Sequence, residues 1–205
     1  MSQNTGTDAS QQELRDFYES GGGAPVVSWK TSRIGDVFKG VFVPVNPEGD
    51  VHRTSQQTNT QNEPLTFDDG SPRTQAEHTL VTPYRNFEFM SEDAVERIKS
   101  TNPNATDDGV RRLFVKGGSM PKEMKKALRQ RGASKPEIGG SIAITLVRRD
   151  NNSFGGKTGV FECSYEKSTP ATQKVVNAYL DSLDGEDSNE VVGTAVDHGT
   201  EDPPF

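Results

Sequence analysis

The sequence predicts a mainly β protein: a curled sheet of five strands, with one helix between the third and the fourth. Three observations indicate this fold class. Five segments of strand length are rich in β-branched and aromatic residues, turns rich in glycine and proline separate them, and one helical pattern interrupts the series before the fourth strand. The chain has 205 residues, 30% apolar and 26% charged, which fits one domain with polar ends better than two domains.

Local signals place the elements in order. The predicted strands cover residues 33–45, 74–84, 110–116, 141–149 and 159–167. Residues 44–72 contain four prolines and two glycine turns, so we expect a long polar loop between the first two strands. Ser91, followed by Asp93, predicts a short helix that reaches Lys99 before the third strand begins.

The helix before the fourth strand has the clearest boundaries. Pro121 suits the first helical position and Gly132 suits the end, which predicts a helix over residues 121–131. The apolar stripe of this helix consists of Met120, Met124, Ala127 and Leu128. A Gly/Asn loop at 151–157 joins the last two strands, and an amphipathic segment at 172–183 follows them. This order of elements is that of an OB-fold, a five-stranded barrel.

Charge and composition divide the chain into three parts. We expect a flexible leader at 1–25, an OB-fold domain at 26–170, and a C-terminal part at 171–205 with a short helical segment and a disordered acidic tail. The formal net charge is -7, but residues 181–205 hold eight carboxylates and no Lys or Arg, whereas residues 110–150 hold eleven basic and three acidic residues. A basic body with an acidic tail is compatible with a nucleic-acid partner despite the overall sign.

Several classes of protein are disfavoured. A single cysteine, Cys163, allows no internal disulfide and suits a reducing compartment. No apolar run approaches the ~18 residues of a membrane span, and the N-terminus lacks a signal-peptide pattern, so we expect a cytoplasmic protein without a membrane partner. Residues 155–158 resemble half of a phosphate-binding loop, but the first glycine and the following helix are missing. The histidines are isolated, so we expect neither a metal nor a cofactor.

The third predicted strand carries the sharpest signal for nucleic acid. Alternation places Arg112, Phe114 and Lys116 on one face, and Arg111, Leu113 and Val115 on the other. An aromatic ring between two cations suits single-stranded nucleic acid, because the ring stacks on a base and the cations meet phosphates. The alternative is that Phe114 belongs to the core and the charges decorate the rim.

The loop between the last two strands adds further candidates. OB-folds use this loop for oligonucleotides; here it holds Phe154 and Lys157, and Arg148 and Arg149 end the strand that leads into it. Trp29 and Lys39 are weaker candidates, since Trp29 is equally suited to close one end of a barrel. We expect the lysines and arginines of the predicted helix to form a solvated face, or a surface against which the acidic tail folds when no DNA is present.

Two resemblances bear on function. The stretch Glu201-Asp202-Pro203-Pro204-Phe205 resembles the tail tip of bacterial single-stranded-DNA-binding proteins. Residues 35–165, with the motifs FDDGSP, DDGVRRLFVKG and GGSIAIT, are similar to small OB-like DNA-binding proteins of tailed phages that infect actinobacteria. Together these resemblances imply a non-catalytic protein of the host cytoplasm that coats single-stranded DNA in replication, recombination and repair without strong sequence preference. They further imply that residues 201–205 recruit partner enzymes. A homo-oligomer is compatible with the sequence.

Two other functions stay open. The carboxylate pairs Asp68-Asp69 and Asp107-Asp108 are compatible with a Mg²⁺-dependent nuclease or another DNA-processing enzyme, although Asp-Gly is also ordinary turn chemistry. A phage assembly or structural protein, whose barrel binds protein and whose polar ends are linkers, is the third hypothesis.

Overall fold

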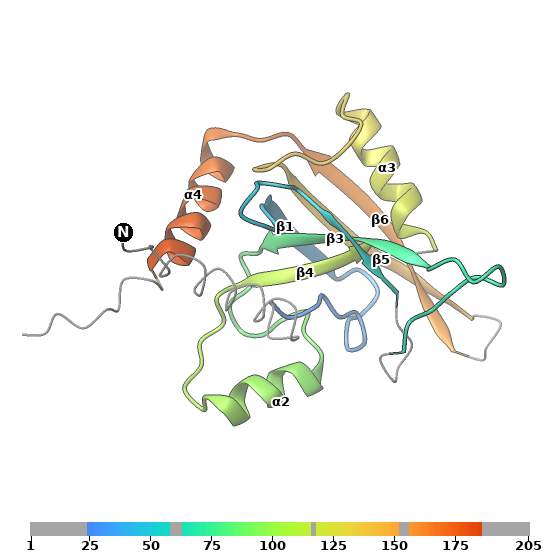
Figure 1. Cartoon of the computed structure of the whole chain (residues 1–205), viewed down its shortest axis with the longest axis horizontal. Helices are drawn as coiled ribbons and strands as arrows, with labels where there is room; N and C mark the ends of the chain where they lie inside the picture. Colours follow the sequence, from blue (N-terminus) through green and yellow to red (C-terminus); the bar gives the residue numbers. More distant parts are fainter. Residues whose placement is uncertain (1–23, 58–62, 116–117, 152–155, 186–205) are drawn as a thin grey trace, which may run out of the picture.

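The computed structural model describes residues 24–57, 63–115, 118–151 and 156–185, and within them the chain is mainly β (Figure 1). Its strands form one antiparallel sheet in the order β2-β3-β1-β5-β6, with β4 also paired to β3. The strands are β1 (Val37–Val43), β2 (Arg53–Gln56), β3 (Thr74–Val81), β4 (Val110–Val115), β5 (Ser141–Asn151) and β6 (Lys157–Glu166).

Strand β3 is the branch point of this sheet because it pairs with three strands, β1, β2 and β4. Val81 is opposite Val41 of β1 on one side and opposite Val110 of β4 on the other. Nearer its start, Glu77 is opposite Arg53 of β2 and Phe114 of β4. Strands β1 and β2 therefore share one edge of β3, and β4 occupies the other.

The predicted strands and their order are confirmed, with one correction. The predicted loop at 44–72 is wrong at residues 53–56, which form β2 and pair with residues 74–77 of β3. This strand has the sequence Arg-Thr-Ser-Gln, so no apolar alternation marks it. It is held by its ladder to β3 and by the side-chain ion pair from Arg53 to Glu77.

The sheet is open in the part of the chain that the structure describes, where no ladder joins β4 to β6. A short N-terminal segment lies along the free edge of β4 instead. The backbone N–H of Arg112 donates to Pro25 O, and the N–H of Val27 donates to Arg112 O, both at 2.9 Å. These bonds satisfy edge groups that a closed barrel would pair with another strand.

The described residues form three helices besides the strands: α2 (Glu92–Thr101), α3 (Met120–Gln130) and, after the last strand, α4 (Pro170–Gly185). The predicted short helix is confirmed as α2, since Ser91 Oγ accepts a hydrogen bond from the N–H of Ala94 at 3.3 Å. The predicted amphipathic segment is part of α4, which begins at Pro170.

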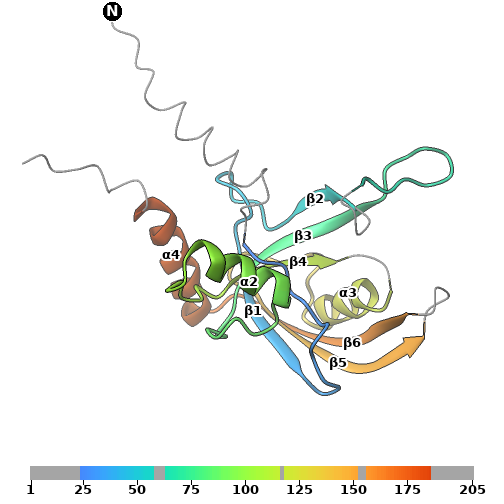
Figure 2. The same ribbon diagram turned by 90° about the horizontal axis from the view of Figure 1, so that it is seen from below.

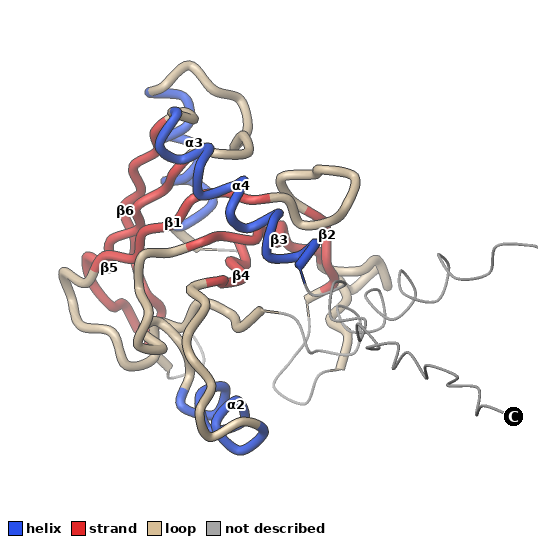
Figure 3. Tube along the Cα trace, turned by 90° about the vertical axis from the view of Figure 1, so that its left-hand side faces the viewer, coloured by secondary structure: helices blue, strands red, loops and turns tan. Residues whose placement is uncertain are grey.

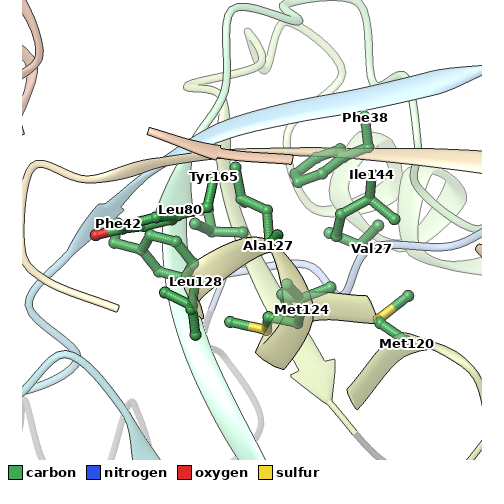
Figure 4. Packing of buried hydrophobic residues seen from close by; sticks show 12 residues of the cluster. Val27, Phe38, Phe42, Leu80, Met120, Met124, Ala127, Leu128, Ile144 and Tyr165 are labelled. Carbon is green, nitrogen blue, oxygen red and sulfur yellow. The ribbon is translucent and has the colours of Figure 1, made fainter. Parts of the chain in front are cut away.

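The core lies between α3 and one face of the sheet (Figure 4). The buried side chains of α3 are those of the predicted stripe, Met120, Met124, Ala127 and Leu128, so that prediction is confirmed. Alternate residues of the strands meet them, among them Phe38, Phe42, Leu80, Leu113, Ile142 and Ile144. Burial of these apolar side chains is the main source of stability.

Helix α4 lies on the other side of the molecule from α3 (Figures 1 and 2) and runs alongside β3 and β1 (Figure 3). Val176 is its one residue in the buried class among those with described side chains. Because α4 buries little of itself, it covers one face of the sheet loosely and leaves room beneath it.

Candidate nucleic-acid interface

Strand β4 sends alternate side chains to opposite faces, as the sequence predicts. Arg111 and Leu113 point inward and are 0% and 2% exposed. Arg112 and Phe114 lie on the other face and are partly exposed. The guanidinium carbon of Arg112 lies 5.7 Å from the centroid of the Phe114 ring. A cation and an aromatic ring therefore stand together on the outer face of the sheet.

A carboxylate lies beside them on the same face. Glu77 Oε1 is 2.8 Å from Arg53 Nη2 and 3.6 Å from Arg112 Nη1. Although it is on the outer face, Glu77 is only 3% exposed, because the neighbouring side chains cover it. Burial lowers the pKa of the Arg112 guanidinium below its usual value, and the Glu77 charge opposes this shift. Arg53, Glu77 and Arg112 thus form a row of side chains across β2, β3 and β4.

The N-terminal segment fixes the orientation of the Arg112 side chain. Its Nε donates to Ala24 O at 2.6 Å, while its backbone pairs with Pro25 and Val27. The guanidinium plane is thus held at Nε and directed by Glu77 at Nη1. A planar group that is already oriented loses less conformational entropy when it binds a phosphate or a base.

A groove of about 760 Å³ runs between this face and α4. Four cations line it: Arg53, Arg85, Arg112 and Lys174. Two carboxylates, Glu77 and Asp108, also line it. Apolar residues of α4, such as Val175 and Ala178, and the ring of Tyr179 form the opposite wall. The groove combines positive charge with apolar walls, which is the combination that single-stranded nucleic acid requires.

Two of the predicted site residues lie instead in the packing of the N-terminal segment. The Trp29 ring contacts Phe89 and Phe161, with centroids 5.3 and 4.9 Å apart. Arg149 Nη2 donates to the carbonyl oxygens of Trp29 and Ser32 at 2.5 and 3.0 Å. Trp29 and Arg149 together anchor this segment against β5 and β6, so the Trp29 ring packs against the core of an open sheet.

The remaining predicted residues lie away from the groove or outside the described residues. Lys39 is exposed on β1. Arg148 pairs with Asp150 at 2.9 Å, and Lys157 begins β6, both on the hairpin that extends away from α4 (Figures 1 and 2). The predicted residues outside the described ranges are Lys116, Phe154, Glu201, Asp202, Pro203, Pro204 and Phe205.

The two Asp-Asp-Gly carboxylate pairs are engaged in turns. Asp69 Oδ1 accepts hydrogen bonds from the N–H and the hydroxyl of Ser71, which lower its pKa. Asp107 is buried and binds Arg111. In the described ranges, no group of three or more His, Cys, Asp or Glu is arranged to hold a metal ion. Hydrogen bonds within the fold thus explain why aspartates occupy positions 69 and 107.

The other sequence signals have structural accounts. Cys163 is half-buried against the core, and its burial, together with the nearby Glu123, raises the pKa of the thiol to about 12. The thiol is therefore protonated at neutral pH and unreactive. Among the helices of the described ranges, none combines the length and the apolar character needed to cross a bilayer.

Sequence reasoning missed Arg53, Glu77 and Lys174 as site residues. Arg53 lies in β2, within the range that the sequence predicts as a loop, and Lys174 meets the groove only because α4 packs back on the sheet. Outward alternation in β3 was the available signal for Glu77. Comparison with known protein families, curated proteins and solved structures gives no match for this chain.

Proposed function

We propose that this protein binds single-stranded DNA without catalysis, over the outer face of β3 and β4. The observation that carries the proposal is the outward pair Arg112 and Phe114 beside a groove lined by four cations. The ring stacks on a base, the cations meet phosphates, and α4 forms the far wall. Base stacking on such a ring contributes about 1–3 kcal/mol per base.

The sheet order supports an OB-type reading of the fold. Without the short β2, the pairing runs β4-β3-β1-β5-β6, so the chain order of the paired strands is third, second, first, fourth, fifth. We take this as an OB-fold whose barrel stays open between β4 and β6, with α3 between its third and fourth strands. OB-folds bind oligonucleotides across their second and third strands, which correspond to β3 and β4.

The test is a titration of a labelled oligo-dT with the full chain, followed by fluorescence anisotropy at two salt concentrations, with duplex DNA of equal length as competitor. We expect tight binding that weakens as salt rises and that duplex does not displace. A duplex that competes as well as the single strand would overturn the proposal. So would the absence of binding at low salt.

We further propose that residues 201–205 recruit a polymerase, helicase or recombinase to the coated DNA. An aromatic residue among acidic residues and prolines suits an apolar pocket with a basic rim. In Phe205→Ala we expect recruitment to DNA-bound protein to be lost while the Kd for oligo-dT is unchanged or lower. A higher Kd for oligo-dT would instead place Phe205 in DNA binding and contradict recruitment as its role.

A further inference from the structure

The row formed by Arg53, Glu77 and Arg112 has a hydrogen-bonding pattern of its own. Each guanidinium is a donor only, and the carboxylate between them is an acceptor only. The carboxylate oxygen is 2.8 Å from one guanidinium nitrogen and 3.6 Å from the other. Read across the sheet from β2 to β4, the row therefore places an acceptor side chain between two donor side chains.

The row has unused hydrogen-bonding capacity. Within the described residues, the hydrogen bonds and ion pairs of Glu77 all involve Oε1, and none involves Oε2. Each guanidinium has five N–H groups, and the side chains of Arg53 and Arg112 are 38% and 20% exposed. All three residues line the groove, which the Glu77 side chain meets with the 4% of its surface that is exposed.

Thymine carries the complementary pattern on its Watson–Crick edge: a carbonyl, an N–H and a second carbonyl. Cytosine has an amino group and a bare ring nitrogen in the first two places, so it would set donor against donor at one guanidinium and acceptor against acceptor at Glu77. Adenine has the same two conflicts, and guanine has one. We propose that this row selects thymine among the bases of single-stranded DNA. The inference rests on the proposed function and adds a base preference to it.

The remaining features of the groove agree with a base as occupant. Its volume of about 760 Å³ lies within the ~300–1,000 Å³ that is usual for small-molecule sites. Tyr179 on the α4 wall supplies an aromatic ring in the groove, and Lys174 supplies a cation for the backbone phosphate. Single-stranded nucleic acids are commonly recognised in this way, by stacking together with hydrogen bonds to the Watson–Crick edge.

The sharpest probe is an oligo-dT in which N3-methylthymidine replaces thymidine, because the methyl group removes the central N–H and leaves both carbonyls. For the full chain we expect the N3-methyl oligonucleotide and oligo-dC to bind more weakly than oligo-dT, on the order of tenfold. Equal affinity for oligo-dT and its N3-methyl form would overturn the inference. This comparison uses the unaltered protein, so it does not depend on the folding of any variant.

The matched variants are Glu77→Gln and Asp108→Asn. Each replaces a groove carboxylate by its isosteric amide and removes one negative charge, but only Glu77 belongs to the row. An amide both donates and accepts, so in Glu77→Gln we expect the ratio of the oligo-dC and oligo-dT dissociation constants to fall several-fold, while in Asp108→Asn it stays at the wild-type value. The same change in both variants would refute the role of Glu77.

These outcomes are separable from a failure of the proposed function. Salt-sensitive binding with equal affinity for all four homopolymers would overturn the thymine preference and leave the single-strand-binding proposal standing. Absence of binding to every single strand would overturn both.

Discussion

Arg111 and Asp107 form a two-pronged ion pair that is fully enclosed by the protein. The Nη1–Oδ1 distance is 2.8 Å and the Nη2–Oδ2 distance is 2.6 Å, and the two side chains are 0% and 1% exposed. Burial acts to raise the pKa of Asp107, but Arg111 and the N–H groups of Gly109 and Phe87 outweigh it, so this pKa lies below its ordinary value. The pair holds the turn into β4 and so sets which side chains of β4 face outward.

Breaking this pair should be costly. In Arg111→Met, Asp107 keeps its charge in a buried site without its partner, and we expect the free energy of unfolding to fall by about 3–5 kcal/mol. The exposed pair of Arg148 and Asp150 gives a matched control, and for Arg148→Met we expect a loss of at most ~1 kcal/mol. Urea denaturation of the two variants measures the difference. Equal losses would show that burial does not increase the contribution of the Arg111–Asp107 pair to the free energy of unfolding.

His78 makes stability depend on pH between about 6.5 and 4. Burial lowers the pKa of this histidine to about 4, and its Nδ1 donates to Val51 O at 2.9 Å, so the folded state holds a neutral ring. Between pH 6.5 and about 4, His78 is protonated in the unfolded chain but stays neutral in the folded protein. The free energy of unfolding should therefore decrease as pH falls, by roughly 3 kcal/mol in total across this window.

The variant that tests this is His78→Asn, which keeps a donor for Val51 O and cannot titrate. We expect urea denaturation at pH 7 and pH 4.5 to show a smaller loss of stability in the variant than in the wild type. His52→Asn, at an exposed ring 5.5 Å from His78, should keep nearly the wild-type dependence on pH. The ion pair of Asp107 weakens only below the ordinary aspartate value of 3.8, so it does not obscure the comparison. If His78→Asn kept the full dependence, another group would be responsible.

Much of the fold could be predicted because its signals are local. Period-two alternation and the stripe of Met120, Met124, Ala127 and Leu128 place the long strands and α3 correctly, since the same side chains fill the core. Strand β2 escaped prediction because its residues are polar and only its pairing with β3 makes it a strand. Whether β4 meets β6 depends on contacts between strands distant in sequence, which no local pattern encodes.

In the candidate site, too, local patterns predict some side-chain positions, whereas contacts between residues distant in sequence determine the others. Alternation around Leu113 was sufficient to place Arg112 and Phe114 on the outer face. It could not show that Arg149 would be held by the carbonyls of Trp29 and Ser32, because that contact joins residues more than a hundred positions apart. The row of Arg53, Glu77 and Arg112 could not be predicted from local patterns, because it depends on the register of three paired strands.

Phe114 should contribute directly to DNA binding. In Phe114→Ala we expect the affinity for oligo-dT to weaken by about 1–3 kcal/mol, because one stacking surface is lost. Phe67 is a matched control: it is 53% exposed and lies under the Arg73 guanidinium at 5.1 Å, but this pair belongs to the loop before β3 and not to β4. Anisotropy should show little change for Phe67→Ala. If Phe67→Ala were the more damaging change, the interface would lie on the loop that precedes β3 rather than on β4.

The salt dependence of binding should locate the phosphates. Lys174 on α4 lines the groove, whereas Lys125 on α3 lies on the other side of the molecule, and both side chains are exposed. Each phosphate contact on a single strand contributes about 0.7 to the slope of log K against log salt. In Lys174→Gln we expect the slope to flatten by about this amount, while in Lys125→Gln it stays unchanged. The opposite result would move the path of the DNA from the groove beside α4 to the basic face of α3.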